Sequence, residues 1–327
     1  MEHKNIAWQQ ALADAFTRVE DLCRHLQIDT DQLQLLPDFK QFPLRAPRGF
    51  VACMEAGNPH DPLLRQVLPL QAELFDYPGY SHDPVGDLPA VATDGVIHKY
   101  HGRVLFIVTG GCAIHCRYCF RRNFPYQELQ LSTQKTQLAI DFIARREDIS
   151  EVILSGGDPL LLNDEKLGRL LQQLGLIPHL KRIRIHSRIP VVLPERITPA
   201  LLDNLSACSQ QIVLVIHANH RNELSEAVGE GCALLRQRNI TLLNQSVLLK
   251  GVNDNGPALC QLSEQLIAFG VLPYYLHLLD KASGVGHFEV SESQALDIMR
   301  HMRRNLPGYL APRLVKEVEG AEYKISI

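Results

Sequence analysis

Six short runs of β-branched and other apolar residues, separated by amphipathic segments, limit most strongly how this chain can fold. The runs span residues 104–108, 151–154, 182–185, 212–216, 240–243 with 247–249 close behind, and 273–278. The amphipathic segments span 133–144, 164–174, 199–205, 222–236 and 257–269. After a longer first interval the runs begin about every 30 residues, the length of a β-α-β unit. The pattern predicts an α/β fold with a parallel (β/α)6 barrel or partial barrel.

Polar and reactive residues follow these runs rather than precede them, or in one case lie within the run. They occupy 110–119, 155–158, 186–188, 217–220, 244–246 and Asp280. Active sites of β/α barrels collect at the carboxyl ends of the strands, where the loops from different strands meet. The six loops are therefore predicted to build one site.

Three regions are predicted along the chain. Residues 1–95 mix helical stretches with Pro-rich connections and are expected to form a mainly helical N-terminal region. Residues 96–290 contain the six runs and are expected to form the (β/α)6 core. Residues 291–327 are expected to form a C-terminal helix and a short tail.

Composition favours small-molecule chemistry. The chain has 327 residues and a formal net charge of −3, with acidic and basic residues interleaved, which gives no sign of a nucleic-acid or membrane surface. No apolar stretch approaches the roughly 18 residues of a membrane helix, and the first thirty residues show helical spacing rather than a secretory leader. Eight cysteines without such a leader favour reduced thiols. We therefore expect a soluble, cytoplasmic protein.

Three of the cysteines are clustered, since Cys112, Cys116 and Cys119 are separated by three residues and then by two. A structural zinc site takes four ligands, usually as two pairs, and no second pair follows here. A four-iron cluster normally takes four thiolates, so three would leave one iron open to a reactant. The cluster of cysteines predicts such an iron–sulfur site, with a zinc site or unrelated core thiols as the alternatives. The other cysteines are isolated and are expected to be small buried apolar residues.

The cysteine spacing, the aromatic Tyr118 before the last cysteine and the strand that precedes the loop resemble the radical S-adenosylmethionine superfamily. In that superfamily the open iron binds S-adenosylmethionine, and one electron from the cluster cleaves it to a 5′-deoxyadenosyl radical. The resemblance implies a 4Fe-4S cluster and S-adenosylmethionine as cofactors. It also implies an electron donor such as flavodoxin or ferredoxin.

From Asp61 onward the chain resembles the lysine 2,3-aminomutase family within that superfamily. The stretches that carry the resemblance are 61–67, 100–119 with 121–122, 154–160, 187–194 and 244–254. This resemblance implies pyridoxal 5′-phosphate as a third cofactor and free L-lysine as the substrate. The short C-terminus most resembles the subfamily called elongation factor P (R)-β-lysylation protein, so structural zinc is not expected and a monomer or dimer is.

By similarity, five residues after the second, fourth and fifth runs line the S-adenosylmethionine pocket: Gly156, Gly157, Asp158, His217 and Gln245. Glycines allow close approach of a ligand to the backbone, although a Gly-Gly-Asp sequence after a strand is more often a turn. The histidine and the glutamine have the alternative of hydrogen bonds within the core.

The family's Schiff-base lysine corresponds to Lys324, with Lys316 as the fallback, because the glycine-rich segment before it is reduced to Gly320. A lysine near the end of a chain would otherwise be frayed and solvated. The family's phosphate contacts correspond to Lys99, Tyr100 and Arg103. Lys99 replaces an arginine of the longer mutases, which keeps the charge and loses the bidentate fork.

Charge matching suggests how an amino acid is held. Arg121, two residues after the last cysteine, is expected to bind the α-carboxylate of the substrate, because a guanidinium pairs bidentately with a carboxylate. Asp280 and Glu317 fall where the family binds the distal ammonium of lysine, and acids there disfavour glutamate. Each acid has the alternative of being a solvated loop residue.

The resemblance implies an isomerase that converts L-α-lysine to (R)-β-lysine, which a lysyl-transferase then attaches to elongation factor P. A stand-alone lysine 2,3-aminomutase of lysine catabolism or osmolyte synthesis is the first alternative. An iron–sulfur electron-transfer or binding protein with a decayed pyridoxal phosphate site is the alternative from a different class.

Overall fold

The computed structural model describes residues 7–37, 40, 42–126 and 132–327, and its strands form one sheet in the order β1 to β10. The strands are β1 (Val91–Thr93), β2 (Val96–Tyr100), β3 (Arg103–Thr109), β4 (Glu151–Gly156), β5 (Arg182–Ser187), β6 (Gln211–Ile216), β7 (Thr241–Val247), β8 (Leu272–His277), β9 (Arg313–Lys316) and β10 (Ile325–Ser326). The helices are α1 (Trp8–Ala13), α2 (Val19–His25), α3 (Arg48–Val51), α4 (Thr133–Ala144), α5 (Asp164–Gly175), α6 (Ile189–Val192), α7 (Pro199–Ser206), α8 (Glu226–Gln237), α9 (Gly256–Ala268) and α10 (Glu292–Asn305).

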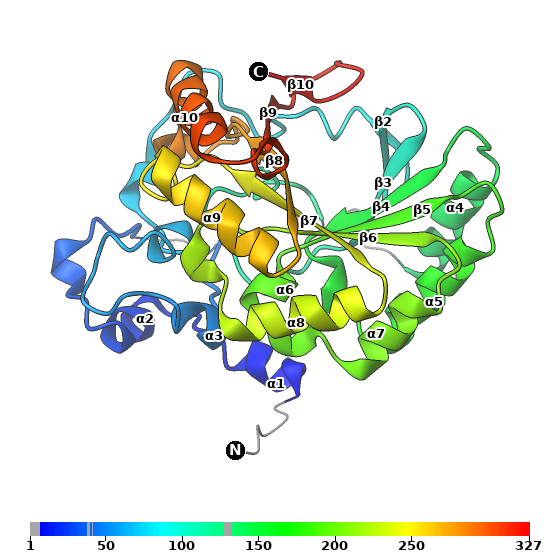
Figure 1. Cartoon of the computed structure of the whole chain (residues 1–327), viewed down its shortest axis with the longest axis horizontal. Coiled ribbons are helices and arrows are strands. Elements are labelled where there is room, and N and C mark those ends of the chain that lie inside the picture. Colours follow the sequence, from blue (N-terminus) through cyan, green and yellow to red (C-terminus); the bar gives the residue numbers. More distant parts are fainter. Residues whose placement is uncertain (1–6, 38–39, 41, 127–131) are drawn as a thin grey trace.

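Strands β3 to β9 pair in parallel with their neighbours, whereas β1, β2 and β10 add antiparallel pairs at the two ends of the sheet. The six predicted strands are β3 to β8, and the five predicted helices are α4, α5, α7, α8 and α9. Strand β9 is a further parallel strand that the pattern did not predict. Within the described residues β1 and β10 each pair with one neighbour, so the sheet is open and the prediction of a partial barrel is confirmed. Figure 1 shows α5, α7, α8 and α9 following one another around the outside of the strands.

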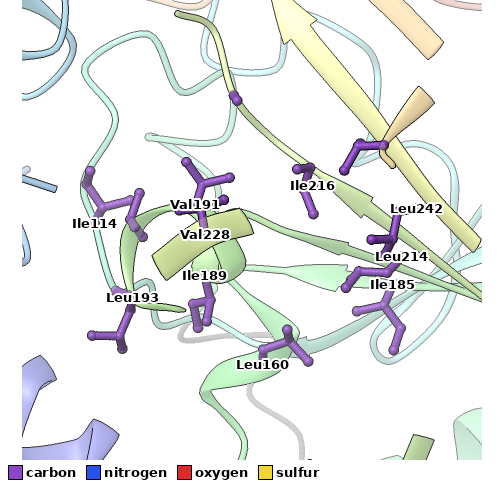
Figure 2. Packing of buried hydrophobic residues seen from close by; sticks show 14 of the residues in the cluster. Ile114, Leu160, Ile185, Ile189, Val191, Leu193, Leu214, Ile216, Val228 and Leu242 are labelled. Atoms are coloured by element: carbon purple, nitrogen blue, oxygen red, sulfur yellow. The ribbon is translucent and has the colours of Figure 1, made fainter. Parts of the chain in front are cut away.

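Successive side chains along a strand point alternately to the hydrophobic core and to the cavity. In β5 the residues Ile183 and Ile185 are fully buried, whereas Arg184 and His186 on the opposite face line a cavity. Figure 2 shows Ile185 close to Leu214 of β6 in the packed core. Burying each such side chain stabilises the fold by about 1.5–3 kcal/mol. A period of two residues therefore turns apolar side chains to the helices and polar ones to the lumen.

The loop that follows β3 is tied into the same core. Ile114, between the first two clustered cysteines, is 3% exposed and belongs to the main hydrophobic cluster with Ile189 and Val191 of α6 (Figure 2). An apolar anchor inside a polar loop fixes the position of its neighbours. The cysteines on either side of Ile114 are thereby held at the end of the sheet.

The N-terminal region consists of short helices joined by turns and 3-10 helices. The helical spacing of the first thirty residues gives two separate helices, α1 and α2, with Trp8 and Leu22 buried against the core. The guanidinium carbon of Arg196 lies 4.8 Å from the centre of the Trp8 ring, which joins this region to the core. Among the described residues, no helix has the length and apolar character needed to cross a membrane.

Candidate active site

A cavity of about 670 Å³ lies in the lumen of the open sheet, and every strand from β2 to β10 contributes to its wall. It brings together nine of the residues predicted from the sequence: Lys99, Tyr100, Arg103, Arg121, His217, Gln245, Asp280, Glu317 and Lys324. Residues from strands far apart in the sequence meet there because alternate side chains along each strand point to the same face of the sheet. The three cysteines and the stretch Gly156, Gly157 and Asp158 are not among the residues that line this cavity.

The three clustered cysteines are free thiols and partly buried. Burial and the neighbouring Cys119, Asp158 and Cys116 raise the pKa of Cys112 well above its ordinary value. Burial and Cys116 raise the pKa of Cys119 to about 11. The thiols are therefore close enough to oppose one another's ionisation, and a positively charged metal group would relieve that cost.

The side chains that this loop offers to a metal group are three thiols. Among the described residues, no group of three or more His, Cys, Asp or Glu side chains is arranged to hold one metal ion. A four-iron cluster occupies more space than one ion, so its thiolate ligands lie farther apart than the ligands of one ion. The donor set of three thiols fits such a cluster by its chemistry.

Two arginines, Arg117 (buried) and Arg122 (partly buried), fix the cysteine loop to the N-terminal region. Arg117 Nε donates to Glu73 Oε1 at 2.8 Å, and Arg122 Nη2 donates to Glu73 Oε2 at 2.6 Å. Burial opposes ionisation of Glu73, but the hydrogen bonds and charges of the two arginines lower its pKa. No local feature of the sequence marks Glu73, because its partners lie more than 40 residues away along the chain.

A further arginine, which is buried, contacts one of the cysteines directly. Arg188 Nη1 lies 2.7 Å from Cys116 Sγ and 2.6 Å from the hydroxyl oxygen of Tyr118. Its Nη2 donates to Gln66 Oε1 at 2.7 Å and to Glu223 Oε2 at 3.2 Å. This hydrogen bond fixes the side chain of Cys116 against α6 and the end of β5. Arg188 lies in the stretch 187–194 that resembles the family and directly after β5, but no role was predicted for it.

The glycines after β4 are needed for close packing. A Cβ atom on Gly156, whose φ is +120°, would lie 2.4 Å from the carbonyl oxygen of Thr109. A Cβ on Gly157 would lie 2.1 Å from the carbonyl oxygen of Gly111. Any side chain at these positions would push apart the loops that follow β3 and β4. Their predicted contact with S-adenosylmethionine stays a prediction.

Both carboxylate oxygens of Asp158 accept hydrogen bonds from other residues of the protein. The carboxylate accepts hydrogen bonds from Ser187 Oγ at 2.7 Å and from the backbone nitrogens of Leu160, Arg188 and Ile189 at 2.8–3.1 Å. Burial raises the pKa of Asp158 to about 6 although these hydrogen bonds oppose the shift. In this structure Asp158 joins the loops that follow β4 and β5, and its predicted role toward S-adenosylmethionine stays a prediction.

Several buried polar atoms at the cavity wall have no hydrogen-bond partner within the described residues: Nε2 of His186, His217 and His277, and Oε1 of Gln245. Burial, together with the charge of Arg188, lowers the pKa of His217 to about 4, so its ring is neutral at pH 7. A buried polar atom without a partner costs about 1–3 kcal/mol. Such atoms at a cavity wall indicate that a bound polar ligand supplies the missing hydrogen bonds. S-adenosylmethionine or another polar group could do so.

Five charged side chains form a chain across the cavity, with signs that alternate. Arg121 Nε lies 2.8 Å from Asp87 Oδ2, Lys99 Nζ lies 2.7 Å from Asp87 Oδ1, and Lys99 Nζ lies 3.1 Å from Glu317 Oε1. Lys324 Nζ forms an ion pair with Glu317 Oε2. The chain joins β2 to the segments after β9, where the sheet is open. Asp87 was not predicted, because nothing local in the sequence distinguishes it from other loop acids.

Lys324, rather than Lys316, faces the cavity. The tail is held because β10 pairs antiparallel with β9, so that Ile325 lies opposite Lys316. Lys324 borders the cavity with a side chain that is 23% exposed, whereas Lys316 pairs with Glu292 at 3.0 Å and does not border it. The tail is therefore ordered by a two-residue strand, and Lys324 is the better placed lysine for a cofactor in the cavity.

The two acids predicted for a substrate ammonium differ in their surroundings. Burial opposes ionisation of Glu317, but Lys324 and Lys99 lower its pKa to about 2. Burial and the charge of Glu317 raise the pKa of Asp280 to about 7. Within the described residues the Asp280 carboxylate has no hydrogen bond or ion pair, although it borders the cavity. Asp280 is therefore a partly buried acid that a cationic ligand would return to its ionised form.

The residues predicted for a phosphate group lie together on one wall. The guanidinium carbon of Arg103 lies 4.7 Å from the centre of the Tyr100 ring, and both residues border the cavity. Arg184 of β5 and Arg313 of β9 also border it and were not predicted. Lys99 already has Asp87, Glu317 and the carbonyl oxygen of Val85 as partners. Arg103 is thus freer than Lys99 to bind a phosphate, whereas the Tyr100 hydroxyl already has Glu317 as a partner.

A cysteine triad after β3, at the end of an open parallel sheet, defines the class to which this chain belongs. The family profile described as the Radical SAM superfamily matches residues 106–261, which run from β3 into α9. The chain is 49% identical over 319 residues to a protein of Escherichia coli (strain K12) named L-lysine 2,3-aminomutase, covering 97% of this chain and 93% of that protein.

Two further relatives carry the same name. A protein of Haemophilus influenzae is 44% identical, covering 97% of this chain and 94% of its own. A protein of Buchnera aphidicola is 42% identical, covering 98% of this chain and 95% of its own. The chain therefore belongs to the L-lysine 2,3-aminomutase family of radical S-adenosylmethionine enzymes, as its sequence motifs predicted.

Proposed function

We propose that this protein is an isomerase that moves the amino group of free L-lysine from the α- to the β-carbon, with a 4Fe-4S cluster, S-adenosylmethionine and pyridoxal 5′-phosphate. The observation that carries the proposal is the cavity in which Lys324, Arg121 and Asp280 meet. Its charges complement the carboxylate and the distal ammonium of lysine. Membership of the lysine 2,3-aminomutase family supports the same reaction.

Residues suited to hold the cofactors occupy separate parts of the site. Cys112, Cys116 and Cys119 would hold the cluster, while the unpartnered His217 and Gln245 would bind S-adenosylmethionine. Pyridoxal phosphate would be attached at Lys324, with Tyr100 and Arg103 at its phosphate. When bound, these groups supply a radical that takes a hydrogen atom from the β-carbon and a carrier for the migrating nitrogen.

The residues of the chain would bind and orient the substrate. Arg121 would bind the α-carboxylate, and Asp280 with Glu317 would bind the distal ammonium. Fixing both ends of lysine presents one carbon to the radical, which makes a demanding reaction effectively unimolecular. Acids at the distal end disfavour glutamate, because two buried like charges repel. The walls contributed by β2 to β10 would keep water away from the radical.

The product would be (R)-β-lysine, passed to the lysyl-transferase that modifies elongation factor P. Support comes from the resemblance to the elongation factor P subfamily and from the match over nearly the whole length of the Escherichia coli and Haemophilus influenzae relatives. The electron donor would be a flavodoxin or ferredoxin, and the enzyme would act as a cytoplasmic monomer or dimer.

The test is product formation by the protein reconstituted anaerobically with iron, sulfide and pyridoxal phosphate. Incubation with lysine, S-adenosylmethionine and a reductant should give β-lysine, and chiral chromatography should show the (R) form. Lys324→Ala should abolish the product, whereas the matched control Lys316→Ala should retain it, because Lys316 does not border the cavity. No β-lysine from protein with intact cofactors would refute the assigned reaction. The (S) form would favour the stand-alone mutase.

A further inference from the structure

Asp87 is a buried acid that lies between two cations, Arg121 and Lys99. In the proposed function these two cations bind different ligands. Asp87 is 2% exposed, and each of its carboxylate oxygens accepts from a different cation. Arg121, on one side, is the proposed partner of the substrate carboxylate. Lys99, on the other side, belongs to the wall where the cofactor phosphate is expected. No sequence motif pointed to Asp87, although it borders the cavity.

The protein binds two nitrogen atoms of the Arg121 guanidinium and leaves the third without a partner among the described residues. Nε donates to Asp87 Oδ2 at 2.8 Å, and Nη1 donates to Ser155 Oγ at 3.2 Å. Within the described residues Nη2 has no hydrogen-bond partner, and Arg121 borders the cavity at 8% exposure. A bidentate carboxylate can therefore approach the end of the fork without displacing Asp87.

Asp87 is itself held in place by its loop. Asp83 Oδ1 accepts from the backbone nitrogen of Asp87 at 2.8 Å, and Asp83 Oδ2 accepts from that of Leu88 at 2.9 Å. The carbonyl oxygen of Val85 accepts from Lys99 Nζ at 2.5 Å, which ties the same loop to β2. The Asp87 carboxylate is therefore held in a fixed position relative to Arg121 and Lys99.

Without Asp87, the nearest acids for these cations would be those proposed for the substrate ammonium. Lys99 already contacts Glu317 at 3.1 Å, and the charge of Glu317 also acts on Arg121. A buried guanidinium that loses its partner turns to the next available acid, because an unpaired buried charge is costly. Arg121 would then turn across the cavity toward Glu317, so its fork would be lost to the α-carboxylate and Glu317 would be less available to the distal ammonium.

We propose that Asp87 is a positioning residue that sets the preference for substrates with an α-carboxylate, by holding the Arg121 fork toward the cavity and away from Glu317. Asp87 does not touch the substrate. The inference rests on the proposed function in one respect, namely that lysine is the ligand of the cavity. It adds a residue to which the family motifs assigned no role.

The test compares lysine with 1,5-diaminopentane, which has both amino groups and lacks the carboxylate. Each is titrated into the pyridoxal phosphate-loaded protein, and binding is read from the absorbance change of the cofactor. Wild type should prefer lysine. Asp87→Ala should lower that preference by about tenfold or more, the usual effect of losing a hydrogen bond to a charged group. Asp87→Asn should lower it less, because its amide oxygen can still accept from Arg121.

Controls separate positioning from folding and from the reaction itself. Asp94→Asn, a loop acid whose side chain is 44% exposed, should behave as wild type. Equal weakening of both ligands in Asp87→Ala would show a merely structural role and overturn the proposal. Tighter binding of lysine would overturn it too, because Asp87 would then compete with the substrate carboxylate. If wild type itself gave no absorbance change with lysine, the proposed function would fail instead.

Discussion

The raised pKa of Asp280 makes lysine recognition depend on pH in a defined direction. Burial and Glu317 raise that pKa to about 7, and an ammonium ion binds to the ionised carboxylate rather than to the protonated one. As the pH falls through the pKa, Asp280 takes up a proton and the attraction is lost. From pH 8 to pH 6 the ionised fraction falls from about nine tenths to about one tenth, so the contribution of Asp280 to affinity falls about tenfold.

Norleucine provides the matched comparison, because it has the carbon chain and α-groups of lysine without the distal ammonium. The ratio of lysine to norleucine affinity, read from cofactor absorbance, removes pH effects that are common to both ligands. We expect this ratio to rise about tenfold from pH 6 to pH 8 in wild type. In Asp280→Asn it should be low and independent of pH. A constant ratio in wild type, or a rise that persists in Asp280→Asn, would refute the reasoning.

Three further predictions concern the cysteine loop and the tail. Glu73→Gln should lower the free energy of unfolding by about 3–5 kcal/mol in urea titrations, because it leaves two buried arginines without their anion; an unchanged midpoint would contradict this. Gly157→Ala should reduce the iron bound per chain, since its Cβ would lie 2.1 Å from the carbonyl oxygen of Gly111; full iron content would argue against close packing there. Borohydride reduction of the pyridoxal phosphate-loaded protein should label Lys324 and not Lys316 in peptide mass spectrometry, and the reverse pattern would reassign the cofactor lysine.

Strands β3 to β8 could be predicted because each is a continuous apolar run at the spacing of a β-α-β unit. Strand β9 has only Leu314 and Val315 between charged residues, and its position depends on pairing with β8. Strand β10 has two residues and depends in turn on β9. Such short strands have too little local preference to be identified, since their hydrogen bonds come from distant segments.

The residues of the candidate site also fall into two groups, those that the sequence predicts and those that only the fold reveals. Motif resemblance led to residues such as Arg121, Asp280 and Lys324, which the structure brings to one cavity. It assigned no role to Asp87 or Arg188, which contact Arg121 and Cys116 across 34 and 72 residues of sequence, respectively. Buried ion pairs between distant segments leave no periodic signal, so only the fold makes them visible.

We expect the thiolates of Cys112, Cys116 and Cys119 to hold a four-iron cluster with one iron open to S-adenosylmethionine. Electron paramagnetic resonance of the reconstituted, reduced protein tests it most directly, with and without S-adenosylmethionine. We predict the signal of a single reduced 4Fe-4S cluster that changes when S-adenosylmethionine is added, and its loss in Cys116→Ser. A cluster signal that S-adenosylmethionine leaves unaltered, or one that survives replacement of all three cysteines, would contradict the account.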